Sequence, residues 1–429
     1  MGRKHKSAKR KKENMNRNKN FVRLLALVLV VSSLYGGLLV DSASAAIVFT
    51  DEQITSNPAS QENPDIFEYG RPQNLSIVYQ DNRNGNWDIY LSSYQSYVWQ
   101  PEFRVTNNSS NQINPKISGN IIVWQDDRNG NWDIYIYNIT AQTETQITNN
   151  TAAQGNPEID GNYIVWLDNR AGHGAIYGYN LTSHTEQLVH LSTLYGYEDL
   201  GSPAISGNRV VWVEHYHDSY PRNKYWLLCR DLSTGSTQTL AYQEWQGLAG
   251  VRNVEAPAIY GDRVVWSYEA GDIYYHLTGK DLAASTSFEV GSVYVLETPY
   301  ERPHLDIYGR YVVYQRAYQV YLHDIDTKST FKVSNNSLHQ MEPRISSQYS
   351  NDIVYMDDRN GNYDIYRTSF GYNLLATLPN PSSTGGVIKD LDSEWLATVI
   401  GSAAVVIVAV IGTAFFVARK RRNSGKSHN

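Results

Sequence analysis

Cysteine is almost absent from this sequence: the 429 residues include only Cys229, so no disulfide can form within the chain. Basic residues are scarce in the long central part, because 15 of the 37 Lys and Arg residues lie within 1–23 and 419–426. Binding to a phosphate backbone needs clustered cations, so the acidic centre argues against nucleic-acid binding. With 33 Tyr and 10 Trp, the chain is too aromatic for disorder and suits a β-rich fold.

An apolar run near the amino terminus predicts a targeting segment. Residues 24–40 are apolar, follow a basic stretch and precede Ala43-Ser44-Ala45, which is the pattern of a secretory signal peptide. We expect residues 1–45 to be a signal peptide cleaved near Ala45. An uncleaved anchor is the alternative, and both interpretations place the residues that follow outside the cell.

A second apolar run predicts a membrane span. Residues 396–418 carry no charge, and as a helix they would extend about 34 Å, enough to cross a bilayer. Basic residues follow at 419–422, and the positive-inside rule assigns them to the cytoplasm. We therefore expect a linker over 381–394, a single transmembrane helix over 395–418 and a cytoplasmic tail over 419–429.

Internal repetition is the strongest signal in the sequence. A Pro-x-Ile segment, a Gly turn, an Ile/Val-Val-Trp/Tyr triplet, a polar turn and an Ile-Tyr segment recur along the chain. The central valines of the triplets mark seven copies: Val78, Val123, Val165, Val211, Val265, Val313 and Val354. Each copy fits four short strands, with Pro at the first position of the first strand and Gly supplying positive φ in the polar turn. The sequence therefore predicts an all-β fold, a seven-bladed β-propeller over 46–380.

The start of this region predicts how the ring closes. Residues 54–66 repeat the pattern of 147–159, which joins the fourth strand of one unit to the first strand of the next. Residues 50–55 are therefore a fourth-type strand without the other strands of its unit. We expect this strand to pair with the seventh unit, which would remove an exposed sheet edge. Residues 373–378 compete for the same position.

The repeat unit resembles that of a known family. Its fullest copy, Pro115–Tyr135, reads Pro-x-Ile, Gly, Ile-Val-Trp-x-Asp-x-Arg-x-Gly-Asn-x-Asp-Ile-Tyr. This pattern resembles the TolB-like propeller repeat, in the form common on prokaryotic and especially archaeal cell-surface proteins. The resemblance covers about residues 47–380 and implies an interaction platform, to which catalytic domains are sometimes attached; none accompanies it here. TolB itself has six such blades and a separate amino-terminal domain, so its role does not carry over.

Three polar turns suggest a calcium hypothesis. Paired Asp residues flank Arg-Asn-Gly-Asn in 81–90, 126–135 and 357–366, and Asp beside a Gly turn can ligate calcium. However, the third position, where a calcium loop has an oxygen ligand, is occupied by Arg83, Arg128 and Arg359. The interpretation we favour is structural: the Asp accepts turn N–H groups and pairs with the Arg.

Histidines suggest a transition-metal hypothesis. His-x-His alternation beside a carboxylate suits such an ion, and the polar turns and the connections between units share one face of a propeller. The candidate ligands are His173, His190, His215, His217 and Asp218. The spacing fixes no third ligand, so ordinary solvated histidines are the alternative, and no cofactor is predicted.

Catalytic motifs are missing, since neither Gly-x-Ser-x-Gly nor His-Glu-x-x-His occurs. We expect a membrane-anchored, non-catalytic binding or cell-envelope interaction module, with an unidentified extracellular protein or polysaccharide partner. The alternative is a carbohydrate-active enzyme, a lyase or glycoside hydrolase, because pairs of carboxylates arise readily among 43 acidic residues. Acidic or His residues converging on the central channel would favour the enzyme, and an aromatic, polar rim would favour the binding module.

Units three to five depart from the regular pattern and predict the binding surface. The connections 191–201 and 241–254 are long, and 215–223 replaces the regular turn of unit four. Exposed Tyr, Trp and Arg often anchor contact surfaces. The candidate residues are Tyr195, Tyr197, His215, Tyr216, His217, Trp245 and Arg252. Neutral insertions are the alternative explanation.

Asn-x-Ser/Thr sequons agree with an extracellular location. They lie at Asn74, Asn107, Asn108, Asn138, Asn149, Asn180 and Asn335.

The expected topology can be tested on intact cells that produce the full chain with a carboxy-terminal epitope. Added protease should remove residues 46–394 and spare the tail, because only the former would face the medium. Immunoblotting measures the surviving fragment. Digestion of the tail epitope in unbroken cells would contradict this topology.

Overall fold

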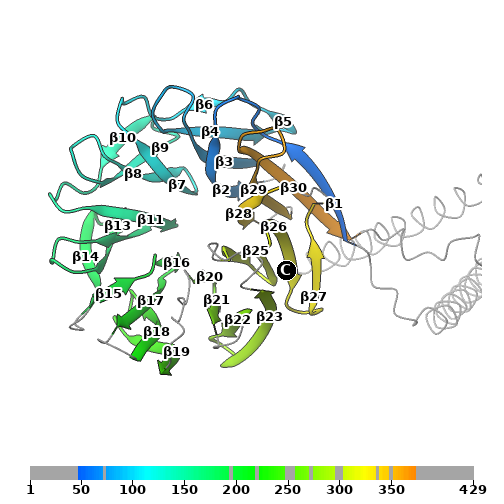
Figure 1. The fold of residues 1–429 in the computed structure, drawn as a ribbon. Helices are drawn as coiled ribbons and strands as arrows, with labels where there is room; N and C mark the ends of the chain where they lie inside the picture. Colours follow the sequence, from blue (N-terminus) through cyan, green and yellow to red (C-terminus); the bar gives the residue numbers. More distant parts are fainter. Residues whose placement is uncertain are drawn as a thin grey trace, which may run out of the picture. The chain divides into compact units, whose positions relative to one another are not determined.

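The computed structural model describes residues 47–70, 74–192, 197–217, 222–246, 257–269, 274–294, 303–334, 338–346 and 351–372. Within these ranges the chain forms strands and turns and no helix. Seven antiparallel sheets follow one another around a ring in chain order, which confirms the predicted seven-bladed β-propeller (Figure 1). Among these residues no helix is long and apolar enough to span a membrane. The expected signal peptide, linker, transmembrane helix and tail lie outside the described residues.

The first three blades follow directly from the first three repeats. Blade 1 contains β2 (Gln61–Tyr69), β3 (Asn74–Asp81), β4 (Asp88–Gln95), β5 (Val98–Trp99) and β6 (Phe103–Arg104). Blade 2 contains β7 (Gln112–Ser118), β8 (Ile121–Asp126), β9 (Asp133–Asn138) and β10 (Thr143–Gln146). Blade 3 contains β11 (Gln154–Asp160), β12 (Tyr163–Asp168), β13 (Ala175–Asn180) and β14 (Thr185–Leu191).

The remaining blades continue the ring. Blade 4 contains β15 (Tyr197–Leu200), β16 (Ala204–Ser206), β17 (Arg209–His217), β18 (Arg222–Asp231) and β19 (Thr237–Gln246). Blade 5 contains β20 (Ala258–Tyr260), β21 (Arg263–Glu269), β22 (Tyr274–Asp281) and β23 (Thr286–Tyr294). Blade 6 contains β24 (Leu305–Tyr308), β25 (Tyr311–Arg316), β26 (Gln319–Asp324) and β27 (Ser329–Lys332). Blade 7 contains β28 (Gln340–Ser346), β29 (Asp352–Asp357), β30 (Asp364–Tyr372) and β1 (Ile47–Gln53).

The apolar triplets form the second strand of each blade and are buried on both faces. In β8, Ile122 and Trp124 pack against blade 1, whereas Val123 packs against blade 3. This division follows from the alternation of side chains along a strand. Trp124 and Trp166 are fully buried between neighbouring blades. A continuous apolar triplet therefore supplies the contacts to both neighbours.

The prolines of four blades lie inside the innermost strand, not at its first residue as predicted. Pro64, Pro115, Pro157 and Pro343 each follow a residue with φ between 51° and 54°, at a point where the pairing register shifts. This is a β-bulge, and a bulged residue needs no ladder hydrogen bond, so the missing N–H of proline costs nothing there. The innermost strands of these four blades consequently begin three residues earlier than the sequence pattern indicated.

The polar turns are held by the structural contacts that the sequence predicted. In blade 2, the backbone N–H and Nε of Arg128 donate to Asp126 Oδ1 at 3.0 and 2.9 Å. The guanidinium lies 4.4 Å from the ring centre of Tyr135 and donates to Glu144 at 2.6 Å. Blades 1, 3 and 7 repeat this arrangement around Arg83, Arg170 and Arg359. The first Asp of the turn is therefore engaged by Arg and by backbone.

The predicted closure of the ring is confirmed. β1 pairs antiparallel with β30 from Ile47↔Tyr372 to Gln53↔Tyr366, and it lies beside β30 in Figure 1. The strand begins before the predicted 50–55. Asp51 takes the place that Glu144 holds in blade 2 and accepts hydrogen bonds from Tyr355 Oη (2.6 Å), Thr368 Oγ1 (2.8 Å) and Arg359 Nη1 (2.7 Å). The competing segment 373–378 lies outside the described residues.

Blade 4 differs from the prediction, because segments expected to be connections are strands. β17 and β18 continue the ladder through His217↔Asn223, and β15 and β19 add Tyr197 and Trp245 to the same row. The sequence signal failed here because these strands carry polar residues and lack the Gly turn of the other repeats. Blade 4 is therefore extended by ordered sheet.

The contacts of Asp51 predict a test of closure in the full chain. Asp51→Ala removes three hydrogen bonds between the two ends of the propeller and should lower the unfolding free energy by about 1–3 kcal/mol. Glu144→Ala is the matched control, since it removes the equivalent Arg partner inside a blade whose strands are sequential; its loss should stay below about 1 kcal/mol. Urea unfolding measures both. Equal losses would show that closure does not depend on Asp51.

Candidate binding site in the central channel

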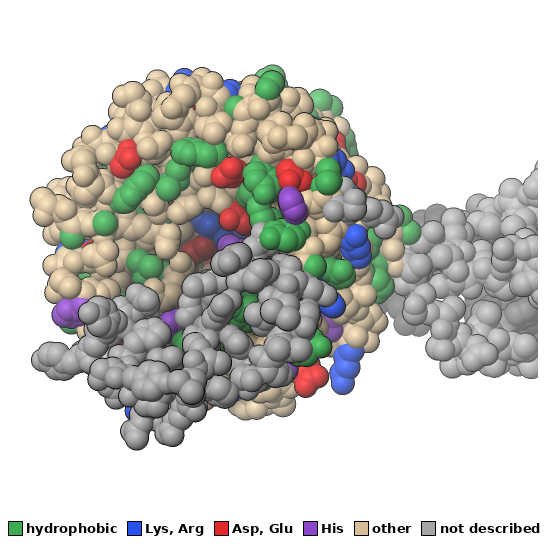
Figure 2. All heavy atoms as spheres, in the orientation of Figure 1, with side chains coloured by type: hydrophobic (Ala, Val, Ile, Leu, Met, Phe, Trp, Pro, Cys, Tyr) green, Lys and Arg blue, Asp and Glu red, His purple; other side chains and the backbone are tan. Residues whose placement is uncertain are grey.

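The innermost strands of the seven blades surround a cavity of about 240 Å³ at the centre of the ring. Figure 2 shows acidic, basic and histidine side chains in a hollow near the centre of the propeller. The face of the ring that carries the polar turns and the connections between blades is called the mouth face here. Strands β2, β7, β11 and β28 begin at this face.

One residue of each innermost strand pairs with the central valine of its blade, and these seven positions are called the charge ring. From blade 1 to blade 7 they are Asp65, Lys116, Glu158, Ala204, Ala258, Asp306 and Arg344. All but Asp65 line the cavity directly. Charges of alternating sign thus occupy five neighbouring positions, and two alanines occupy the others.

Ion pairs connect the charge ring across the channel. Lys116 Nζ lies 3.4 Å from Glu158 Oε1, in the neighbouring blade. Arg344 reaches from blade 7 to the same oxygen of Glu158, at 3.7 Å, and so links blade 7 to blade 3 across the channel. Nearby carboxylates raise the pKa of Arg344 further above its ordinary value despite its burial. Both cations of the ring therefore share one carboxylate.

The two remaining acids tie neighbouring blades together. Asp65 Oδ2 accepts the backbone N–H of Ile117 at 2.8 Å, and Asp306 Oδ2 accepts that of Ile345 at 2.9 Å. Burial raises the pKa of both carboxyls, and that of Asp65 reaches about 6, although Arg344 and Lys116 act in the opposite direction. These acids are therefore positioned by backbone contacts between blades 1 and 2 and between blades 6 and 7.

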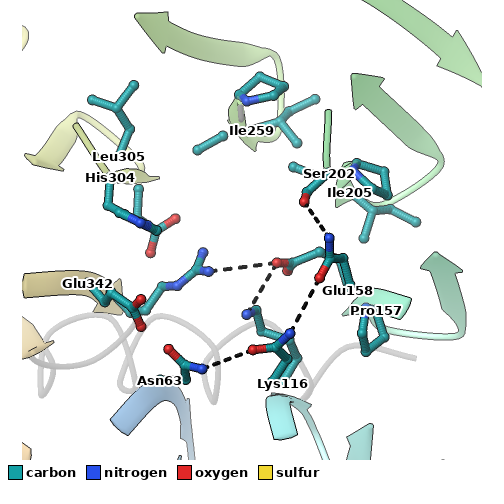
Figure 3. A pocket seen from close by; sticks show the side chains of 18 of the residues that line it. Asn63, Lys116, Pro157, Glu158, Ser202, Ile205, Ile259, His304, Leu305 and Glu342 are labelled. Atoms are coloured by element: carbon teal, nitrogen blue, oxygen red, sulfur yellow. Dashed lines mark hydrogen bonds and ion pairs between the residues drawn. The ribbon is translucent and has the colours of Figure 1, made fainter. Parts of the chain in front are cut away.

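A row of side-chain amides lines the mouth of the cavity. Asn63 donates to Asn114 at 2.9 Å, Asn114 to Asn156 at 3.3 Å, and Asn156 to Ser202 Oγ at 3.1 Å (Figure 3). The bulges hold these asparagines at positive φ, and Gln80 and Gln125 of the second strands accept further hydrogen bonds from them. The row fixes the spacing of blades 1 to 4 at the mouth.

Two more titratable groups lie near the cavity on the side of blades 6, 7 and 1. Burial lowers the pKa of His304, which lines the cavity, while Glu342 raises it and the two cations of the ring lower it. Burial and the neighbouring Glu342 raise the pKa of Glu62. Acidic groups and a histidine therefore converge on the channel, which is the feature that we expected of an enzyme.

The described residues of the predicted binding surface lie toward one end of the long strands of blade 4. His215 is 5% exposed and packs edge-on against Tyr225, with the ring centres 4.5 Å apart. Tyr197, His217 and Trp245 share a cross-strand row, and Tyr216 lies in the next row. Tyr195 and Arg252 lie outside the described residues. The structure thus brings Tyr197, His217 and Trp245 to the same row of the extended sheet.

The candidate metal ligands are spread over several places. His190 contacts Glu214 at 3.3 Å, and its ring lies tilted against Trp212 with the ring centres 4.9 Å apart. His215 follows Glu214 along β17 and so lies on the opposite face of blade 4. His173 is exposed in the turn of blade 3, and Asp218 lies outside the described residues. Within the part of the chain that the structure describes, no three His, Cys, Asp or Glu side chains are close enough to hold a metal ion.

Several sequon asparagines have structural contacts. Asn107 and Asn149 are exposed. The side-chain oxygens of Asn74, Asn108, Asn138 and Asn180 accept backbone N–H groups in turns. Asn335 lies outside the described residues. Of the described sequon asparagines, Asn107 and Asn149 are the most exposed.

No family model matches the chain, and no curated protein matches it. Among solved structures, an oligogalacturonate lyase in complex with manganese is similar, with a TM-score of 0.51 and 11% identity over 74% of this chain and 99% of that one. TolB from Acinetobacter baumannii is similar with a TM-score of 0.34 and 18% identity, over 49% of this chain and 50% of that one. The β-propeller domain of the trilobed protease from Pyrococcus furiosus is similar with a TM-score of 0.49 and 10% identity, over 77% of this chain and 98% of that one.

The likeness to the oligogalacturonate lyase agrees with the fold described above. At such identities the likeness extends to the fold alone. The sequence pattern did not predict the charge ring. In several copies the residue that follows the repeat proline is charged, and this is the signal for the ring. In blade 6, however, two extra residues between Pro303 and Val313 shift the equivalent position away from the proline.

The raised pKa of Asp65 predicts a pH dependence of stability. The folded chain binds the proton of the Asp65 carboxyl more tightly than the unfolded chain does. The stabilisation that this proton gives to the folded chain is therefore full below pH 3.8 and is lost as the pH rises through about 6. Asp65→Asn removes this dependence. The stability of the wild type relative to Asp65→Asn should therefore fall by about 2 kcal/mol between pH 4 and pH 7, measured by urea unfolding.

Asp281→Asn is the control for this measurement. Hydrogen bonding from the Ala284 N–H lowers the pKa of Asp281, so its contribution is lost only as the pH falls below 3.8. The difference between this variant and the wild type should stay constant from pH 4 to pH 7. A similar slope for both variants would contradict the assignment to Asp65.

Proposed function

We propose that this chain is a membrane-anchored, extracellular β-propeller that binds a cell-surface partner through its mouth face and catalyses no reaction. The observation that carries the proposal is the engagement of the channel carboxylates. Asp65 and Asp306 hold backbone N–H groups of the next blade, and Glu158 is paired with two cations. Carboxylates held in this way position the blades and leave little freedom for proton transfer or nucleophilic attack.

The closure of the ring supports the orientation in this proposal. Ile47 and Tyr372 are opposite each other at one end of blade 7, whereas the polar turn after Asp357 lies at the other end, on the mouth face. The chain therefore enters and leaves the propeller at the end of the blade that is remote from the mouth.

A carbohydrate-active enzyme is the second candidate, favoured by the convergence of acids and His304 on the channel. With a pKa of about 6, Asp65 has the property of a general acid. Against this, an oligogalacturonate chain carries a carboxylate on each sugar, and the excess of acids in this channel would repel it. The size of the cavity, about 240 Å³, also suits a small group better than a saccharide chain.

Site-specific photo-crosslinking in intact cells that produce the full chain tests the proposal. A photo-reactive phenylalanine at Leu338, which is 44% exposed in the connection between blades 6 and 7, should give adducts with a surface partner. The matched control is the same substitution at Ala141, which is exposed in a turn at the opposite end of blade 2. We expect adducts, detected by immunoblotting, from position 338 only.

Two results would contradict the proposed function. Adducts from position 141 in place of 338 would move the binding surface to the other face. Release of product from a panel of neutral and acidic polysaccharides by the purified full chain, lost in Glu158→Gln, would show catalysis in the channel.

A further inference from the structure

The alternation of the charge ring stops at blades 4 and 5. Along neighbouring blades the signs run minus, plus, minus, plus, minus, through Asp306, Arg344, Asp65, Lys116 and Glu158. Ala204 and Ala258 occupy the two positions between Glu158 and Asp306. A gap without side-chain charge is therefore flanked on both sides by a carboxylate.

With its three carboxyl groups ionised, the ring is one positive charge short. It holds three carboxylates and two cations, and both cations approach Glu158. Glu342 adds a further acid among the lining residues. Burial lowers the pKa of His304, which keeps this histidine from supplying the missing charge at neutral pH. Excess negative charge in a confined, poorly solvated space is costly unless a counter-charge enters it.

The cavity provides room for that counter-charge beside the alanines. Its wall there is apolar, formed by Ile205, Ile259 and Leu305, which lie on the side opposite to Lys116 and Asn63 (Figure 3). A calcium ion takes six to eight oxygen ligands, and this wall supplies none. An organic cation suits the site better, because an alkyl chain can contact the wall while the charged group faces the carboxylates.

We propose that the gap of the charge ring binds an ammonium or guanidinium group, seated between Glu158 and Asp306 with its alkyl chain against Ile205, Ile259 and Leu305. This inference rests on the proposed binding role of the mouth face and adds the chemistry of the bound group. That group belongs either to a free alkyl amine or to a Lys or Arg side chain presented by a protein partner. In both cases the ligand completes the alternation of charge around the channel.

Calorimetric titration of the full chain in detergent tests the binding. The probe is n-butylammonium, and n-butanol is the uncharged control of similar length. We expect saturable binding of the amine and at least about tenfold weaker binding of the alcohol, because only the amine meets the two carboxylates. A blocked peptide with one Lys distinguishes the source: tighter binding of the peptide indicates a partner side chain, and tighter binding of the amine indicates a free ligand.

A pair of variants tests whether the gap lacks charge and not merely volume. Ala204→Lys places an ammonium group in the gap from within the chain, and Ala204→Met adds a similar volume without charge. Ala204→Lys should melt a few degrees higher than Ala204→Met, and both should abolish binding of n-butylammonium. Equal melting temperatures would overturn the proposal, as would amine and alcohol binding alike.

Competition with metal ions is a further test of the site. Displacement of n-butylammonium by millimolar calcium or sodium, with the same rise in melting temperature, would identify a metal site and overturn the proposal. The two proposals fail separately: loss of amine binding with adducts retained at position 338 overturns this inference alone, whereas absence of those adducts overturns the proposed function.

Discussion

The propeller depends on the pairing of β1 with β30. Every other blade is built from strands that follow one another in sequence, but blade 7 takes its outer strand from the amino-terminal end of the described chain. Seven register pairs and the three hydrogen bonds to Asp51 hold this strand in place. Each blade packs only against its two neighbours. Without the pairing of β1 with β30, the contact between blades 7 and 1 would therefore lose the constraint that holds the ring closed.

In the channel, equivalent backbone positions of the seven blades carry different side chains. Pairing with the central valines places one side chain of each blade at an equivalent point, whatever its chemistry. Substitutions there change the channel while the ladders stay the same. Most of these side chains are charged and engage one another or the backbone, whereas two are alanines, and this break in symmetry gives the cavity a polar and an apolar side.

The fold could be predicted from the sequence because its signals are local and repeated. The apolar triplets, the Gly turns and the early fourth-type strand gave the blade count and the closure, and the structure confirms both. Blade 4 was harder, since a long hairpin of polar residues such as His215 and Lys224 lacks the alternation that marks a half-buried strand. The charge ring was harder still, because it depends on strand register, and the insertion in blade 6 shifts Asp306 relative to its proline.

The closing strand also sets the order in which the molecule can be completed. Gln53 and Asp364, which are joined by a hydrogen bond, are 311 residues apart in sequence, so nearly the whole propeller must be synthesised before they meet. At a typical elongation rate of about 5–20 residues per second, β1 waits tens of seconds for its partner. Throughout that interval its edge is an open template for pairing with other chains. In this strand three apolar residues, Ile47 to Phe49, are followed by four polar ones, Thr50 to Gln53, and the charges of Asp51 and Glu52 disfavour pairing of that half with other chains.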